Sequence, residues 1–333
     1  MVLPTALRLL NKVTVLGKRN ADDLGTVILA PERGAGGDPR YPGNHAPNFQ
    51  APVLKFFRDE ARRQGMKEFR AMDPCAGSGT TGDVCAALGI EADLYDLRPD
   101  PPWRGRGSFN MLWDEPDRRA HFIWAHWPYW NMYRYQELLG HKNPGDLSMI
   151  EAWDDFLSQS GKALARLIQF VQPGGWLGVL VGTLRRGGIT YDMALEMPKP
   201  CRVAHRIIKG QFNESSARQS YGGRPLLRIA HEDLLIFRRD DAYIFTAMIP
   251  VKKSWDLRNS PSLTWRGAVI AALHHLGGQA TLGRLYREME PFKISKENHH
   301  PDERIRATLQ EGEGRDFRRI APGVWGLRDR AAA

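Results

Sequence analysis

The feature that most constrains the fold is a short glycine-containing loop between an expected strand and an expected helix. The strand covers 69–72, the loop reads DPCAGSGTTG over 73–82, and the helix that follows stops at Gly89. Two closely spaced glycines, Gly77 and Gly79, let the backbone pass close to a ligand. In an open α/β sheet, the loop that leaves the carboxyl end of a strand lies where ligands bind. We therefore expect an α/β protein with a ligand site at this loop, here called the glycine loop.

Strand-like and helix-like segments alternate along the rest of the first 240 residues. Helices are expected at 52–64 and 151–170, and further strands at 92–95, 108–113, 122–125, 176–181, 203–208 and 234–237. This alternation predicts a doubly wound, mostly parallel sheet with helices on both faces, a Rossmann-like arrangement. The chain of 333 residues suits one large domain plus a smaller one. We expect an N-terminal extension over 1–30 and the main domain over 31–245.

The pattern changes near residue 250. Three short helices are expected at 264–275, 280–290 and 301–311, and a small hairpin at 316–329 turns around Pro322 and Gly323. Three helices followed by a hairpin is the order of a winged helix-turn-helix. We expect such a domain over 258–330.

Charge and cysteine content narrow the class of partner and the compartment. The net charge is +9, and an excess of this size often indicates contact with a polyanion, most commonly nucleic acid, although it also serves solubility. The sequence has three widely spaced cysteines, Cys75, Cys85 and Cys201. Their spacing does not match a zinc site, and their odd number and wide separation argue against a set of structural disulfides. No run of about 18 apolar residues is present. We expect a cytoplasmic protein with no metal and no membrane span.

The glycine loop differs from the common phosphate-binding loops. It is not GxGxxG and has no Gly-Lys-Ser/Thr, which disfavours a pyrophosphate dinucleotide and ATP. Asp96 ends the next strand about 20 residues on, where an acidic residue can accept both ribose hydroxyls. A ribose site without a phosphate cradle predicts S-adenosylmethionine (AdoMet). The alternative is a tight turn followed by an incidental aspartate.

A second motif, FIWAHWPYW over 122–130, ends another expected strand. The apolar run stops at His126, and two tryptophans, a tyrosine and a proline follow. A core can use the aromatic rings, but it has no need of His-Trp-Pro-Tyr in that order. The segment 126–129, here called the HWPY segment, therefore indicates a site at this strand end.

These two motifs resemble those of the AdoMet-dependent DNA amino-methyltransferases, which act on adenine N6 or cytosine N4. AMDPCAGSGTTGDVCAALGIEADLYD resembles the family's DPFxGSGTT cofactor motif, with Cys75 where Phe is usual. AHWPYW resembles its catalytic motif, (Asp/Asn/Ser)-Pro-Pro-(Tyr/Phe/Trp). NHAPNFQAPVLKFF at 44–57 and AHEDLLIFRR at 230–239 extend the resemblance over roughly 40–240. It implies that the cofactor is contacted by His45, Asp73, Cys75, Gly77, Ser78, Gly79, Thr80 and Asp96.

The resemblance also implies a catalytic role for each residue of the HWPY segment. An exocyclic amine is a poor nucleophile because its lone pair is delocalised, so the enzyme must position it and place acceptors at its N–H bonds. His126 takes the acceptor position, Trp127 and Pro128 take those of the two prolines, and Tyr129 is the stacking ring. Neutral imidazole can accept one hydrogen bond and later a proton. A hydrogen-bonded histidine at a strand end, beside aromatic core residues, is the alternative.

A target base inside a duplex must be flipped out to reach such a site, which calls for a grip on the nucleic acid. Trp130 and Arg134 follow the motif and are expected to contact the base or its backbone. Two basic and polar segments, 183–190 and 209–228, are further candidates. In a winged helix, Arg304 and Arg306 on the third helix and Arg318 near the wing would meet DNA. Many winged helices bind proteins instead.

The sequence favours a methyltransferase acting on double-stranded DNA in the cytoplasm, associated with the nucleoid when bound. Cytosine N4 is favoured slightly over adenine N6, because the motif ends in PYW and begins with a non-acidic residue. The alternatives are an RNA base methyltransferase and an inactive AdoMet-binding regulator, for which the HWPY departure is the best support. The recognition sequence, a partner nuclease of a restriction system and the choice between monomer and dimer stay open.

Overall fold

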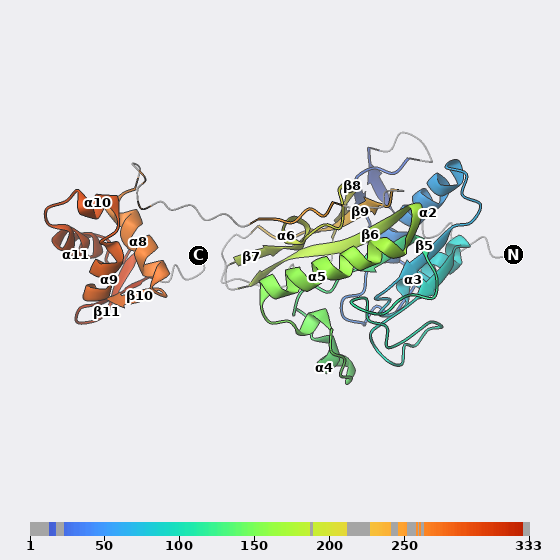
Figure 1. The fold of residues 1–333 in the computed structure, drawn as a ribbon, viewed down its shortest axis with the longest axis horizontal. Helices are drawn as coiled ribbons and strands as arrows, with labels where there is room; N and C mark the ends of the chain where they lie inside the picture. Colours follow the sequence, from blue (N-terminus) through green and yellow to red (C-terminus); the bar gives the residue numbers. More distant parts are fainter. Residues whose placement is uncertain are drawn as a thin grey trace. The chain divides into compact units, whose positions relative to one another are not determined.

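The chain divides into two compact units, Met1–Pro250 and Val251–Ala333, in the computed structural model shown in Figure 1. The structure describes residues 13–17, 23–186, 189–211, 227–240, 246–251, 258, 260 and 263–328. Each unit has its own buried hydrophobic core. Among the described residues, no helix is long and apolar enough to span a bilayer.

The first unit is built on a mixed sheet of nine described strands. Their order is β1 (Thr14–Leu16), β2 (Val27–Leu29), β8 (Val203–Gly210), β9 (His231–Arg238), β6 (Val171–Arg186), β5 (Ala120–His126), β3 (Arg70–Asp73) and β4 (Glu91–Leu94), while β7 (Ile189–Asp192) pairs with β6. From β4 through β3 and β5 to β6, neighbouring strands are parallel. β9 lies antiparallel to both β6 and β8. The carboxyl ends of the parallel strands therefore meet at one edge, where a ligand site is expected.

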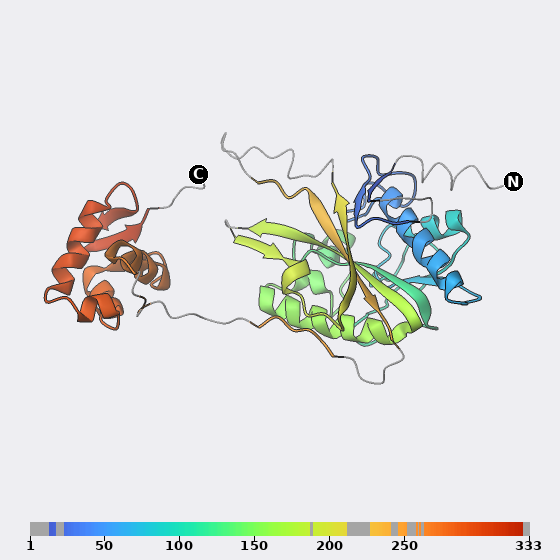
Figure 2. The same cartoon turned by 90° about the horizontal axis from the view of Figure 1, so that it is seen from above.

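Helices cover both faces of this sheet. Figure 2 shows α2 (Pro47–Arg63) and α3 (Thr80–Leu88) on one side and α5 (Trp153–Leu167) on the other. The side chains of strand β5 show why both faces need cover. Phe122 and Trp124 pack with α2 and α3, whereas Ile123 and Ala125 pack with α5. Because side chains alternate along a strand, an uninterrupted apolar run such as 122–125 is buried on both faces.

Within 1–30, β1 and β2 add to the sheet, and β2 runs parallel to β8. One expectation about this unit needs correction, because no strand forms over 108–113. There the Asn110 side chain accepts from the Leu112 amide (2.9 Å), and Asp114 accepts from the Asn110 amide (2.7 Å). Such local side-chain bonds compete with a strand ladder and make a turn.

The other expected elements are present with shifted bounds. β6 begins before 176 and continues past 181, because its far end pairs with β7 as a hairpin. α5 ends at Leu167, and the last turn becomes the 3-10 helix η2 (Ile168–Phe170). Shorter elements not anticipated from the sequence are α4 (Tyr135–Leu139), η1 (Leu147–Met149) and α6 (Met193–Glu196).

The second unit contains the three expected helices and the expected hairpin. They are α8 (Trp265–His275), α9 (Leu282–Met289), α11 (Pro301–Glu311), β11 (Phe317–Ala321) and β12 (Val324–Leu327), with β10 (Gln279–Thr281) and α10 (Lys293–Lys296) in addition. β10 joins the hairpin in a three-stranded sheet, in the order β10-β12-β11. The Thr264 hydroxyl accepts from the Gly267 amide (3.1 Å) and caps α8. The core of the second unit includes Val269, Leu285 and Trp325.

Candidate active site

A cavity of about 750 Å³ lies beyond the carboxyl ends of β3, β4 and β5. Ligand pockets typically measure about 300–1,000 Å³, so the space suits a cofactor-sized molecule. Residues of the glycine loop line it together with Asp96 and the HWPY segment. The two motifs, which are separated by some fifty residues in sequence, thus face one space. Sheet register brings them together, since β3 and β5 are neighbours.

The glycine loop requires its glycines for both conformation and space. Gly77 and Gly79 have φ angles of 51° and 83°, in the left-handed region that favours glycine. A Cβ at Gly79 would lie 2.6 Å from the Trp103 ring, and one at Gly77 would lie 2.9 Å from the Tyr41 ring. Trp103 Nε1 also donates to the Gly77 carbonyl (3.0 Å). The loop is therefore held closely, and its last residues, from Thr80 on, already form the first turn of α3.

Asp96 lies beside the glycine loop, as expected. Its side chain is buried, Oδ2 accepts from the Gly77 amide (2.7 Å), and Oδ1 accepts from the Arg98 amide (2.9 Å). Burial raises the pKa of Asp96, and these two amides partly offset that effect. A carboxylate has about four acceptor positions, so both oxygens can accept further hydroxyl groups. Ser78 lines the same cavity and contacts the Thr80 hydroxyl (3.1 Å).

Asp73 begins a buried hydrogen-bond chain that reaches His45. It accepts from the Cys75 amide (3.0 Å) and from the Thr81 hydroxyl, and Thr81 accepts from Gln50 Nε2 (2.8 Å). The Gln50 carbonyl oxygen lies 2.9 Å from His45 Nε2, which therefore carries the hydrogen. Burial raises the pKa of Asp73 to about 7 despite its hydrogen bonds. The chain ties α2 to the glycine loop, and sequence reasoning missed Gln50 and Thr81.

His126 and His45 are neutral at physiological pH. Burial lowers the pKa of His45 to about 3 and that of His126 to about 4. Their ring centroids are 5.4 Å apart with an edge-on arrangement, and His126 meets the Tyr129 ring in the same way at 5.6 Å. Two charged imidazoles at this distance would repel each other, which adds to the cost of protonating either one. His126 thus offers a neutral nitrogen to the cavity that it lines.

Tyr129 is held by a residue that sequence reasoning missed. Its hydroxyl donates to Glu232 on β9, and Glu232 also pairs with Lys209 on β8. Burial alone would raise the pKa of Glu232, but the Lys209 charge and the hydrogen bonds from Lys209 and Tyr129 oppose it, and the pKa lies at about 2. The carboxylate is therefore ionised. The signal in the sequence was the pair of acidic residues, Glu232 and Asp233, that precedes the apolar run LLIF in the same expected strand region.

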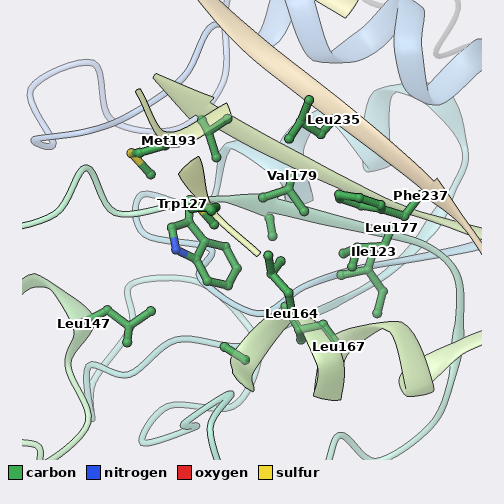
Figure 3. Close-up of a cluster of buried hydrophobic side chains, with 14 of the residues drawn as sticks. Ile123, Trp127, Leu147, Leu164, Leu167, Leu177, Val179, Met193, Leu235 and Phe237 are labelled. Carbon is green, nitrogen blue, oxygen red and sulfur yellow. The ribbon is translucent and has the colours of Figure 1, made fainter. Parts of the chain in front are cut away.

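Trp127 and Trp130 turn away from the cavity into the core. The Trp127 indole is 1% exposed and donates to Ser160 on α5 (3.0 Å), and Figure 3 shows it among side chains of α5 and β6. Only the backbone of Trp127, and not its ring, can therefore contact a ligand in the cavity. Trp130 is 5% exposed, donates to the Ile150 carbonyl (2.7 Å) and packs against Trp153. The expectation that Trp130 contacts a base is therefore wrong, because core packing uses the ring.

Cys75 and Pro128 complete the cavity wall, whereas Arg134 does not contribute to it. The Cys75 thiol donates to the His126 carbonyl (3.2 Å), which links the glycine loop to the HWPY segment, and burial raises the thiol pKa. Pro128 lines the cavity between Trp127 and Tyr129. Arg134 pairs with Glu137 (2.8 Å) and Glu151 instead of facing the cavity.

The arginines expected to meet DNA lie on the second unit. Arg306 on α11 and Arg318 on β11 are exposed, while Arg304 pairs with Glu311 (3.0 Å). Most of the segment 209–228, and two residues of 183–190, fall outside the described residues. Within the described part of the chain, no cluster of three or more His, Cys, Asp or Glu side chains could hold a metal ion.

Comparison with known proteins gives distant structural likenesses. No family model matches the chain, and no curated protein matches it. An amino pentose methyltransferase from Micromonospora echinaspora, bound to AdoMet, aligns at 14% identity and TM-score 0.26, over 41% of this chain and 59% of its own. A 1,6-didemethyltoxoflavin-N1-methyltransferase from Burkholderia thailandensis, bound to S-adenosylhomocysteine, aligns at 14% identity and TM-score 0.31, over 57% and 77%.

A candidate DNA modification methylase from Thermus thermophilus, complexed with AdoMet, aligns at 19% identity and TM-score 0.25, over 41% of this chain and 54% of its own. The chain therefore spans less than two thirds of two of these three structures. At these TM-scores the likenesses assign no activity. The functional conclusion rests on the geometry of the cavity.

Proposed function

We propose that this protein is an AdoMet-dependent methyltransferase that modifies an exocyclic amino group of a base in DNA. The observation that carries the proposal is the shared cavity. One wall is formed by the glycine loop and Asp96, and another by the HWPY segment. A cofactor and a flipped base bound at these two walls would meet at the space between them. Bringing the two reactants together in this way is a large part of catalysis by such an enzyme.

The residues of the first wall suit the AdoMet nucleoside and its amino-acid end. Asp96 retains acceptor positions for ribose hydroxyls, and Gly77 and Ser78 line the cavity beside it. His45 also lines the cavity, just before α2, and the resemblance implies that this segment contacts the methionine end of AdoMet. When bound, AdoMet supplies an activated methyl group on a sulfonium.

The residues of the second wall suit an amino group. Neutral His126 offers an acceptor for one N–H bond, and the Trp127 carbonyl at the strand end offers another. Tyr129 presents a ring edge-on to His126, held at its hydroxyl by Glu232. These groups orient the amine, and His126 can then accept the proton that the amine releases. Cytosine N4 remains favoured slightly over adenine N6, on the motif.

The second unit supports DNA as the macromolecule. Apart from the short α10, its order of helix, strand, helix, helix and hairpin is that of a winged helix, in which one helix enters the major groove and the wing contacts phosphate. In such an arrangement, exposed Arg306 on α11 and exposed Arg318 on the hairpin would supply those contacts. The net charge of +9 favours association with a polyanion.

Methyl transfer from tritiated AdoMet tests the proposal directly. The substrates are a mixed-sequence duplex DNA, a duplex without cytosine, and transfer RNA. Incorporation into the first duplex and not into RNA supports the proposal, and loss of incorporation in the cytosine-free duplex assigns cytosine. Transfer to RNA alone would make this an RNA methyltransferase. AdoMet binding without transfer to any of the three would make the protein a regulator.

A further inference from the structure

Glu232 is a buried acid on the wall of the proposed substrate site. The residue is 6% exposed, and it lines the cavity together with His126 and Tyr129. A buried carboxylate is costly unless it is paired and hydrogen-bonded. Lys209 on β8 supplies the pairing cation. Lys209 is not among the residues that line the cavity, so the cavity faces the negative member of the pair.

Sheet register sets this arrangement. Glu232 lies opposite Gly182 on β6 and opposite Lys209 on β8. A Cβ at Gly182 would lie only 2.5 Å from Cε2 of Tyr129. The missing side chain therefore leaves the space that the Tyr129 ring occupies, with its hydroxyl on Glu232. The three strands place Lys209, the carboxylate and the ring in one row.

Glu232 keeps acceptor positions for a substrate. A carboxylate has about four of them on its two oxygens. Tyr129 donates to Oε1 and Lys209 donates to Oε2. Each oxygen therefore retains one position, and the carboxylate lines the cavity.

The proposed reaction creates positive charge where an anion would help. The amine nitrogen uses its lone pair to form a bond to the methyl carbon, while the methyl–sulfur bond breaks and leaves its electron pair on sulfur. The nitrogen is then cationic until it releases one proton, which neutral His126 accepts. Positive charge thus moves from sulfur to nitrogen. An anion beside the nitrogen stabilises the transition state more than the reactants. His126, being neutral, cannot provide that charge.

We propose that the Glu232 carboxylate, rather than the Trp127 carbonyl, is the second hydrogen-bond acceptor beside His126 for the amino group of the target base, and that its charge selects amino-bearing bases over carbonyl-bearing ones. This inference rests on the proposed function of the same cavity. Glu and Asp side chains accept hydrogen bonds from cytosine N4 in nucleic-acid recognition. A carbonyl oxygen in the place of the amine would face the carboxylate and be repelled.

A double-mutant cycle in the full chain separates direct action from action through Tyr129. We expect Glu232→Gln to lower kcat by about 100-fold or more, the scale found for one preorganised electrostatic group. Tyr129→Phe should lower kcat less than about tenfold, and Glu232→Gln should cost the same factor in the Tyr129→Phe background. If Tyr129→Phe alone matches Glu232→Gln and the double variant is no worse, Glu232 only positions the ring and the proposal is overturned.

Two variants control for folding and for charge. Glu232→Gln leaves Lys209 buried and unpaired, so Glu232→Gln with Lys209→Met removes both charges. A folded neutral variant that still lacks turnover supports the proposal, and recovery of turnover contradicts it. Asp233→Asn is the matched control. Asp233 is the next buried acid on β9, but it pairs with Arg206 (2.8 Å) and does not line the cavity. Its kcat should stay near that of the wild type.

Nucleoside binding separates this inference from the proposed function. Titration with 2′-deoxycytidine against 2′-deoxyuridine, and 2′-deoxyadenosine against 2′-deoxyinosine, is followed by NMR with S-adenosylhomocysteine present. Each pair differs by an amine replaced with a carbonyl. Wild-type protein should prefer the amine by about tenfold, and Glu232→Gln should lose the preference. Preference without methyl transfer would refute the methyltransferase and keep Glu232 as the amine acceptor. A wild type without preference would refute the role of Glu232 itself.

Discussion

The hydroxyl of Tyr129 donates a hydrogen bond to the carboxylate of Glu232, although the two residues are 103 positions apart in the sequence. Tyr129 follows the end of β5, and Glu232 lies on β9, two strands along the sheet. The ring crosses β6 at Gly182, where no side chain blocks it. The substrate wall of the cavity is thus made from three strands, of which only β5 carries the recognisable motif.

Adding a methyl group at Gly182 should disturb this wall without affecting the cofactor wall. In Gly182→Ala the new Cβ would overlap the Tyr129 ring and force it to move. We expect kcat for methyl transfer to fall at least tenfold, while the AdoMet dissociation constant changes less than about threefold. Gly283→Ala on α9 is the matched control, because nothing lies within 4 Å of its added Cβ. Equal kcat for Gly182→Ala and wild type would contradict the placement of Tyr129.

Removing the Asp96 carboxylate should weaken AdoMet binding. Hydrogen bonds to a charged group contribute about 1.5–3 kcal/mol, so Asp96→Ala should raise the dissociation constant by about 10- to 100-fold in calorimetric titrations. Asp93→Ala is the control, since Asp93 lies on β4 but pairs with Arg118 on the surface (2.8 Å). Thermal melts of both variants show whether the Gly77 contact of Asp96 also supports the fold. Unchanged affinity in Asp96→Ala would remove Asp96 from the cofactor site.

Protonation of His126 should cost folding stability in a defined pH window. The unfolded imidazole has a pKa near 6.5, and in the folded protein burial lowers it to about 4. The unfolded chain therefore binds more protons between these values, and stability falls as the pH drops from 6.5 toward 4. The loss from this group is on the order of 2 to 3 kcal/mol.

Comparison of variants isolates this effect. The raised pKa of Asp73 acts in the opposite direction over the same window, because that carboxyl takes up a proton in the folded state. The difference in unfolding free energy between wild type and His126→Asn cancels such shared contributions. The difference should change by this amount between pH 7 and pH 4 in urea titrations.

Arg306 on α11 should strengthen DNA binding by neutralising one backbone phosphate. Arg306→Ala should weaken binding to any duplex and reduce the slope of log K against log salt by about 1. Lys162→Ala, at an exposed position on α5, serves as the control for a lost surface charge. Fluorescence anisotropy of labelled duplex, measured from about 50 to 200 mM salt, gives the affinity and the salt slope of each variant. An unchanged salt slope in Arg306→Ala would place α11 away from the DNA backbone.

The sequence predicted the parts of the fold that depend on short-range pattern. The apolar run 122–125 indicated a strand buried on both faces, and β5 is such a strand. Gly77 and Gly79 indicated a tight loop between a strand and a helix, and the loop between β3 and α3 has positive φ angles at both glycines. The strand expected over 108–113 is absent because Asn110 and Asp114 bond to nearby amides, a local competition that hydrophobic pattern does not record.

Tertiary structure alone decided which side chains of the motifs face the cavity. His126, Trp127, Tyr129 and Trp130 are adjacent in sequence, yet both tryptophans point into the core and the other two point into the cavity. Likewise Glu232, Lys209 and Gly182 form one row only because β8, β9 and β6 are hydrogen-bonded in register. Periodicity along one segment carries the information for that segment's own faces. Pairing between distant strands depends on the packing of the whole core, and so the composition of the substrate wall appears only in the folded chain.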